Sequence, residues 1–241
     1  MKEEIVDSAK AIQEVAKATG QGIDLVKKIG TFFSRIMDEP IAATCGMLAD
    51  TLKFKRWERQ VKLIEKVEQI MKEKRIEGKF TPIEPKLALP IFHNASLENN
   101  ELLHDLWAKL LVSAMDPSYQ AKTRTAYIDI IKQLDPLDVK ILKKMNVVYQ
   151  KKISTSTFFK EKTPTYVCIL KKDLLEDLTV SNEDYWTAVD NICRLGLACS
   201  YIEGDTIDTE EDSYDVVTSH GGYNALSLTA LGLSFVKICT Y

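Results

Sequence analysis

Two clusters of side chains in this sequence have residue types and spacings that could perform chemistry. Glu101 and His104 are three residues apart, so a helix places a carboxylate and an imidazole on one face, as in di-iron bundles. Such a site needs a second motif and two more glutamates, and the sequence has one motif. The acidic run Asp205–Asp215 lacks the residue order of an EF-hand calcium loop. We therefore predict a surface Glu101–His104 pair and a solvated acidic loop.

Other signatures of catalysis or cofactor binding are absent from the sequence. It has no Gly-x-Ser-x-Gly turn, phosphate loop or dinucleotide fingerprint. The five cysteines are odd in number and contain no Cys-x-x-Cys pair, which favours reduced thiols over disulfides or a zinc site. We predict a protein that is not an enzyme, with no catalytic residues, no metal ligands and no cofactor.

The charge of the chain is distributed unevenly. Residues 171–241 hold four basic and thirteen acidic residues, while the whole chain has a net charge of only −3. Such polarity can steer a charged partner. The charged N-terminus is unlike a signal peptide, and no apolar run is long enough to span a bilayer. We expect a cytoplasmic protein, with the periphery of the inner membrane as a further location.

The first forty residues carry an apolar seam with alternating spacings of three and four residues, typical of a coiled-coil helix. Glycines near position 20 weaken a helix interior, so the pattern predicts two helices, roughly 3–19 and 22–37. The seam has three interpretations: packing against the next long helix, self-association, or entry into a membrane. The residues that we predict to mediate self-association or partner contact are Ile12, Ala16, Ile23, Val26, Gly30 and Phe33.

Further helices follow along the chain. A second long helix is predicted over 42–76, and three prolines within 78–90 predict an extended connector. Apolar stripes predict three more helices, at about 97–115, 119–133 and 136–149.

The last third of the chain combines short helices with β-prone segments. The expected order is a strand at 165–170, a short helix, a helix ending near 195, two strands around an acidic loop at 203–222, and a final helix. This is the order of a winged-helix module. Glu183, Asp184 and Asp190 on the candidate recognition helix would repel phosphate, so we expect it to dock a protein rather than DNA.

The overall prediction is a mainly α fold in three parts. Residues 1–80 form long amphipathic, coiled-coil-like helices, and 81–136 form a central helical bundle. Residues 137–241 form a winged-helix-like α+β module with an acidic loop.

Several runs resemble the Abi-alpha family, a bacterial family of undefined biochemistry associated with abortive infection, a form of phage defence. The runs are Asp50–Gln60, with its Trp-Glu-Arg-Gln, Ala95–Glu98, Asp105–Leu111, with its Leu-Trp-Ala-x-Leu-Leu, Ala114–Pro117, Tyr127–Asp138 and Leu228–Val236. The resemblance implies a defence role and supplies no catalytic residues. The charged residues within these runs form inter-helix ion pairs or caps, or line a partner-binding face: Arg56, Arg59, Glu98, Asp105, Asp116 and Asp138.

Three functions remain open at this stage. The first is a non-enzymatic defence protein that contacts a phage component or a second copy of itself, as a homo-oligomer, with the N-terminal helix able to disturb a membrane surface. The second is a winged-helix DNA-binding regulator, although nucleic acid is not the partner we expect. The third is an enzyme with an unrecognised site around Glu101 and His104.

Overall fold

The computed structural model describes residues 21–36, 54–76, 78–119, 123–155, 167–175, 178–202 and 223–239. The chain divides into two compact units, Met1–Lys132 and Gln133–Tyr241. The described part is mainly helical with one small three-stranded antiparallel sheet, which confirms the mainly α class. Within it, no helix combines the length and apolar character needed to cross a membrane.

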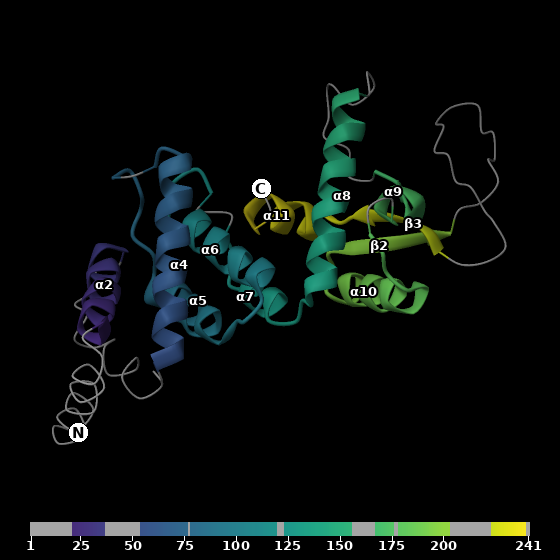
Figure 1. Ribbon diagram of the computed structural model, residues 1–241. Coiled ribbons are helices and arrows are strands. Elements are labelled where there is room, and N and C mark those ends of the chain that lie inside the picture. Colours follow the sequence, from purple (N-terminus) through teal and green to yellow (C-terminus); the bar gives the residue numbers. More distant parts are fainter. Residues whose placement is uncertain are drawn as a thin grey trace. The chain divides into compact units, whose positions relative to one another are not determined.

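Unit 1 is a group of helices around a long central one (Figure 1). The central helix α4 has buried positions at three- and four-residue spacings, including Ile64, Val67 and Met71, so its apolar stripe meets neighbours on more than one side. Helices α2, α5 and α6 each contact α4. The helices of this unit are α2 (Gln21–Ile36), α4 (Phe54–Glu73), α5 (Pro85–Leu97), α6 (Glu101–Met115) and α7 (Ala126–Ile131).

The predicted extended connector over 78–90 was wrong beyond residue 84. Helix α5 begins at Pro85 and continues through Pro90. Pro85 lies in the first turn, where a missing N–H breaks no helical hydrogen bond. Pro90 removes one interior bond, but Ala88, Ile91 and Phe92 are fully buried and hold the helix in place.

The other boundaries in unit 1 agree with the sequence pattern in part. Helix α2 matches the predicted 22–37 segment, while the predicted helix 3–19 and residues 42–53 lie outside the described residues. Helix α6 begins at Glu101 and not near the predicted residue 97, because the side chain of Asn100 accepts hydrogen bonds from the backbone N–H groups of Leu102 and Leu103. Helix α7 is shorter than predicted.

Unit 2 places helices around the sheet, whose strand order is β1-β3-β2. Both neighbours of β3 are antiparallel to it; Leu226 pairs with Ile169 on one side and Ser200 on the other. The elements, in chain order, are α8 (Pro136–Thr155), β1 (Ile169–Leu170), α9 (Lys171–Leu175), α10 (Asn182–Arg194), β2 (Ala198–Ile202), β3 (Tyr223–Leu228) and α11 (Ala230–Cys239).

Local signals set the ends of the helices in unit 2. The Ser181 hydroxyl accepts a 3.0 Å hydrogen bond from the Asp184 N–H at the start of α10. Gly196 closes α10 with φ +71°, a conformation that favours glycine. The Thr229 hydroxyl accepts from the Gly232 N–H at the start of α11. The predicted acidic loop, with Asp205–Asp215 and His220, lies outside the described residues.

Candidate functional site

The amphipathic helix α2 is attached to unit 1 by its apolar face. Ile29, Phe32, Phe33 and Ile36 are at most 6% exposed. The rings of Phe32 and Phe33 both meet Phe92 of α5, with centroids 5.6 and 4.4 Å apart. Spacings of three and four residues place these side chains on one side of the helix. The packing interpretation of the N-terminal seam therefore holds for residues 29–36.

Polar contacts border this apolar attachment. On the surface, Lys28 forms an ion pair of 2.9 Å with Glu65, and Arg35 one of 3.0 Å with Glu68. Each side chain of these two pairs is at least 41% exposed, so each pair contributes only about 0–1 kcal/mol. At the end of α2, the Ile36 carbonyl accepts a 2.9 Å hydrogen bond from the Ile83 N–H.

The structure describes only some of the residues that we predicted to mediate self-association. Ile12 and Ala16 lie outside the described residues. Ile23 and Val26 belong to α2, but their side chains are not described. Gly30 is half-buried, and nothing lies within 4 Å of where its Cβ would stand. Phe33 is buried inside unit 1.

A charged seam joins α4 to α6. Glu101 pairs with Lys62 and, at 3.0 Å, with Lys66, which also pairs with Asp105. Hydrogen bonds from Lys62 and Lys66 lower the pKa of Glu101 from 4.5 to about 2. Burial alone would lower the pKa of Lys66, but its hydrogen bonds to Asp105 and Glu101 raise it above 10.5.

His104 is not the surface partner of Glu101 that we predicted. It is 2% exposed, and its Nε2 lies 3.2 Å from the carbonyl of Arg59 on α4. Burial, followed by the nearby charge of Lys66, lowers the pKa of His104 below 6.5. Its Nδ1 and the Oε1 of buried Gln60 have no hydrogen-bond partner among the described groups.

Three more of the charged residues singled out in the sequence, Arg59, Glu98 and Asp116, stabilise helix ends and turns. Arg59 donates to the carbonyl of Ser96 at 3.3 Å and to Asn99, which ties α4 to the end of α5. Glu98 accepts from the Asn100 N–H, and Asp116 accepts from the Ser118 N–H, both at 2.8 Å. Arg56 lies half-buried on α4.

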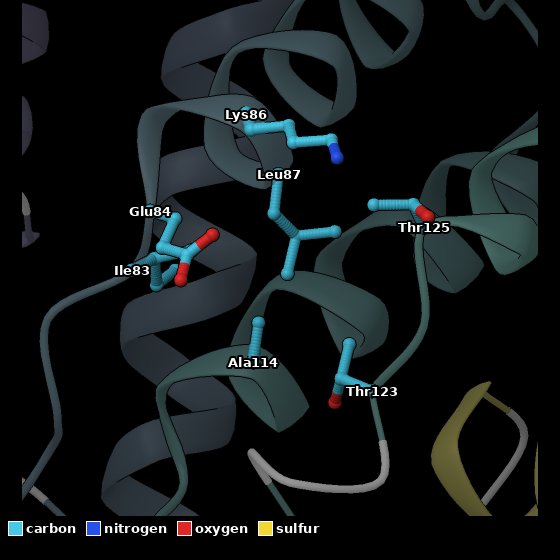
Figure 2. Close-up of a pocket in the computed structure, with 7 residues that line it drawn as sticks. All are labelled: Ile83, Glu84, Lys86, Leu87, Ala114, Thr123 and Thr125. Carbon is cyan, nitrogen blue, oxygen red and sulfur yellow. The ribbon is translucent and has the colours of Figure 1, made fainter.

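A hollow of about 320 Å³ opens beside the first turn of α5 (Figure 2). Figure 2 shows Glu84 and Lys86 reaching into it on either side of Leu87, with Thr123 and Thr125 on a facing segment. Its lining residues come from three parts of unit 1: Ile83, Glu84, Lys86, Leu87, Ala114, Thr123 and Thr125.

Most polar side chains that line this hollow make no capping hydrogen bond or ion pair in the described part of the chain. Glu84 is the N-cap residue of α5, yet its carboxylate makes no capping hydrogen bond. The hydroxyl of Thr125 makes no capping bond to α7 either, while Thr123 donates to the Tyr119 carbonyl at 3.3 Å. Neither the carboxylate of Glu84 nor the ammonium of Lys86 is paired with another residue in the described part of the chain.

Comparison with protein families gives a match to abortive infection alpha over residues 58–239. The chain belongs to the abortive infection alpha family. This confirms the sequence resemblance and supports a role in abortive infection, a form of phage defence. Comparisons with curated proteins and with solved structures found no match.

In this member of the abortive infection alpha family, the matched span contains both the charged seam and the hollow, while α2 precedes it. Sequence reasoning did not single out Glu84 and Lys86. They lie among three prolines, from which we predicted an extended connector. Pro85 could instead have been interpreted as the first residue of a helix, a position that proline favours. No group of His, Cys, Asp and Glu suited to a metal occurs within the described ranges.

Proposed function

We propose that this protein is a non-enzymatic phage-defence protein that acts through self-assembly, with α2 as its contact element. The observation that carries the proposal is the attachment of α2: four apolar side chains on one face, bordered by two exposed ion pairs. A defence protein must stay inactive until infection. Helix α2 can supply this control, because the apolar face that attaches it to unit 1 would equally suit another chain. The attached and the paired helix are then the two states.

Helix α2 needs an apolar surface to pack against, whether it is attached to unit 1 or released from it. A 16-residue helix is marginal in water by itself, because nucleation is unfavourable and its stability comes from burying an apolar face. When α2 leaves α4 and α5, Phe32 and Phe33 become exposed. The α2 helix of a second copy offers the same apolar face, so pairing of copies restores the lost burial.

We assign to unit 2 a winged-helix arrangement that serves protein contact. The order α8, β1, α9, α10, β2, β3, α11 and the sheet order β1-β3-β2 support it. Glu183 and Asp184 are exposed in the first turn of α10, and their charge disfavours approach to a DNA backbone.

Reversing two surface charges tests the assembly step without changing α2. The double variant Glu65→Lys, Glu68→Lys turns both ion pairs with α2 into repulsions. We expect its mass in solution, measured by light scattering after size exclusion, to increase relative to the parent at equal concentration. The matched control is Glu58→Lys, Glu73→Lys, which makes the same charge change on the same helix without touching the two ion pairs to α2.

A third substitution shows whether α2 mediates the assembly. Phe33→Asp, added to the double variant, should return the mass to that of the parent. Assembly that survives Phe33→Asp, or an unchanged mass when protease shows α2 released, would contradict the proposal. Leakage from anionic vesicles without a mass increase would place the released helix in a membrane instead.

A further inference from the structure

The hollow beside α5 has the features of a small-molecule site. It combines an apolar surface from Ile83, Leu87 and Ala114 with a carboxylate, an ammonium and two hydroxyl groups. We propose that it binds a free amino acid with an apolar side chain, and that the bound ligand holds α2 in its attached position.

The charges of the site determine the ligand class. Glu84 can only accept hydrogen bonds, and Lys86 can only donate them. Within the described part of the chain neither is paired with another residue, and a ligand that pairs with both carries an ammonium and a carboxylate. The Thr125 hydroxyl, which makes no capping bond to α7, can donate to or accept from the same polar groups. A ligand with only one charge would pair with only one of these two exposed side chains and leave the other to water.

The size of the hollow limits the ligand further. A volume of about 320 Å³ lies at the small end of the roughly 300–1,000 Å³ range of small-molecule pockets. A single amino acid of the leucine or phenylalanine type has this size. A dinucleotide or a peptide of several residues would extend well outside it.

The site is linked to α2 through two contacts. Ile83 lines the hollow, and its N–H donates to the carbonyl of Ile36, the last residue of α2. Helix α5, which contributes Lys86 and Leu87 to the hollow, also carries Phe92, which packs against both phenylalanines of α2. A ligand that joins the 84–87 segment to Thr123 and Thr125 would fix the segment that holds the end of α2.

Binding is tested on the full chain by titration calorimetry with L-leucine and L-phenylalanine. We expect saturable binding of at least one of them. Two controls remove one charge each from leucine: 4-methylpentanoate lacks the ammonium, and 3-methylbutylamine lacks the carboxylate. Each should bind roughly tenfold more weakly, the effect of losing about 1.4 kcal/mol.

Variants of the exposed charges locate the site. Glu84→Gln should weaken leucine binding roughly tenfold and leave 4-methylpentanoate unaffected, because that probe has no ammonium for Glu84 to bind. Lys86→Met should likewise weaken leucine binding roughly tenfold and leave 3-methylbutylamine unaffected, because that probe has no carboxylate for Lys86 to bind. No saturable binding up to about 10 mM, or leucine binding unchanged in both variants, would overturn the site.

The link to α2 rests on the proposed function, and hydrogen exchange tests it separately. At a ligand concentration ten times its Kd, exchange of the α2 amides should slow by up to roughly tenfold. Binding without slower exchange would refute the link and leave the site in place. Binding with slower exchange in a protein that never assembles would instead refute the proposed function.

Discussion

His104 and Arg59 are 45 residues apart in the sequence and meet inside unit 1, where His104 Nε2 lies 3.2 Å from the Arg59 carbonyl. A carbonyl only accepts, so Nε2 carries the proton and Nδ1 presents a lone pair. The contact joins α6 to α4 and by itself raises the pKa of His104, but burial and the nearby charge of Lys66 outweigh it, so the folded unit 1 favours the neutral imidazole.

Acidification should therefore destabilise unit 1 through His104. Its pKa in the folded protein lies below 6.5, so the unfolded chain takes up the proton first as pH falls. The stabilisation is complete above about pH 6.5 and decreases as pH falls through the folded pKa. Urea unfolding followed through Trp107 should show this slope, and His104→Gln should remove it. The control His93→Gln, at an exposed position, should keep it. A full slope in His104→Gln would contradict this assignment.

Glu101 should add a second acid transition at lower pH. Its pKa is lowered to about 2, so the stabilisation from its pairs with Lys62 and Lys66 is present above 4.5 and is lost as pH falls toward 2. The side chain is 62% exposed, so water and salt reduce the effect. We expect Glu101→Gln to lessen the loss of stability below pH 4.5 in low salt, whereas Glu58→Gln should not. An equal effect in about 1 M salt would argue against an ionic cause.

The buried carboxyl group of Asp138 should give the stability of unit 2 the opposite dependence on pH. It is 2% exposed, and its Oδ2 accepts from the Asp135 N–H at 2.8 Å and from Asn191 at 2.7 Å. Burial raises its pKa above 3.8, so the protonated form is favoured in the folded state and stability falls as pH rises through the folded pKa.

The pair Asp138→Asn and Asp138→Ala separates the charge of Asp138 from its role as an acceptor. At neutral pH, Asp138→Asn keeps an acceptor oxygen without a buried charge and should be at least as stable as the parent. Asp138→Ala leaves two donors unsatisfied and should lose about 1–3 kcal/mol of unfolding free energy. Equal losses in thermal denaturation would indicate that the charge itself is required.

Features set by neighbouring residues were predictable from the sequence. Ser181 before α10 and Gly196 after it are local signals, because capping depends on residues within one turn. The charged residue Asp105 was also singled out, as either an ion-pair partner or part of a partner-binding face, and it pairs with Lys66.

Features set by distant residues were not predictable. The burial of His104 depends on the α4 backbone, and the spacing of Glu101 and His104 alone favours a surface pair. The hollow depends on segments near 84, 114 and 124 meeting in space, and no local pattern of charges marks such a meeting. The prediction of a connector failed at Pro90 because burial of α5 stabilises the helix by more than the loss of one helical hydrogen bond destabilises it.

Two helical glycines should respond in opposite ways to alanine. A Cβ on Gly232 would stand 1.8 Å from the carbonyl oxygen of Leu197, a backbone atom that cannot move aside without shifting β2. Gly232→Ala should therefore destabilise unit 2 by about 3 kcal/mol or more. At Gly30 nothing lies within 4 Å, so Gly30→Ala should stabilise α2 by about 0.5–1 kcal/mol through its helix propensity. Hydrogen exchange resolves both effects, with faster exchange in α10 and α11 for Gly232→Ala and slower exchange in α2 for Gly30→Ala. Faster exchange of α2 in Gly30→Ala would mean that the open side of Gly30 contacts another chain, as close packing of the predicted seam requires.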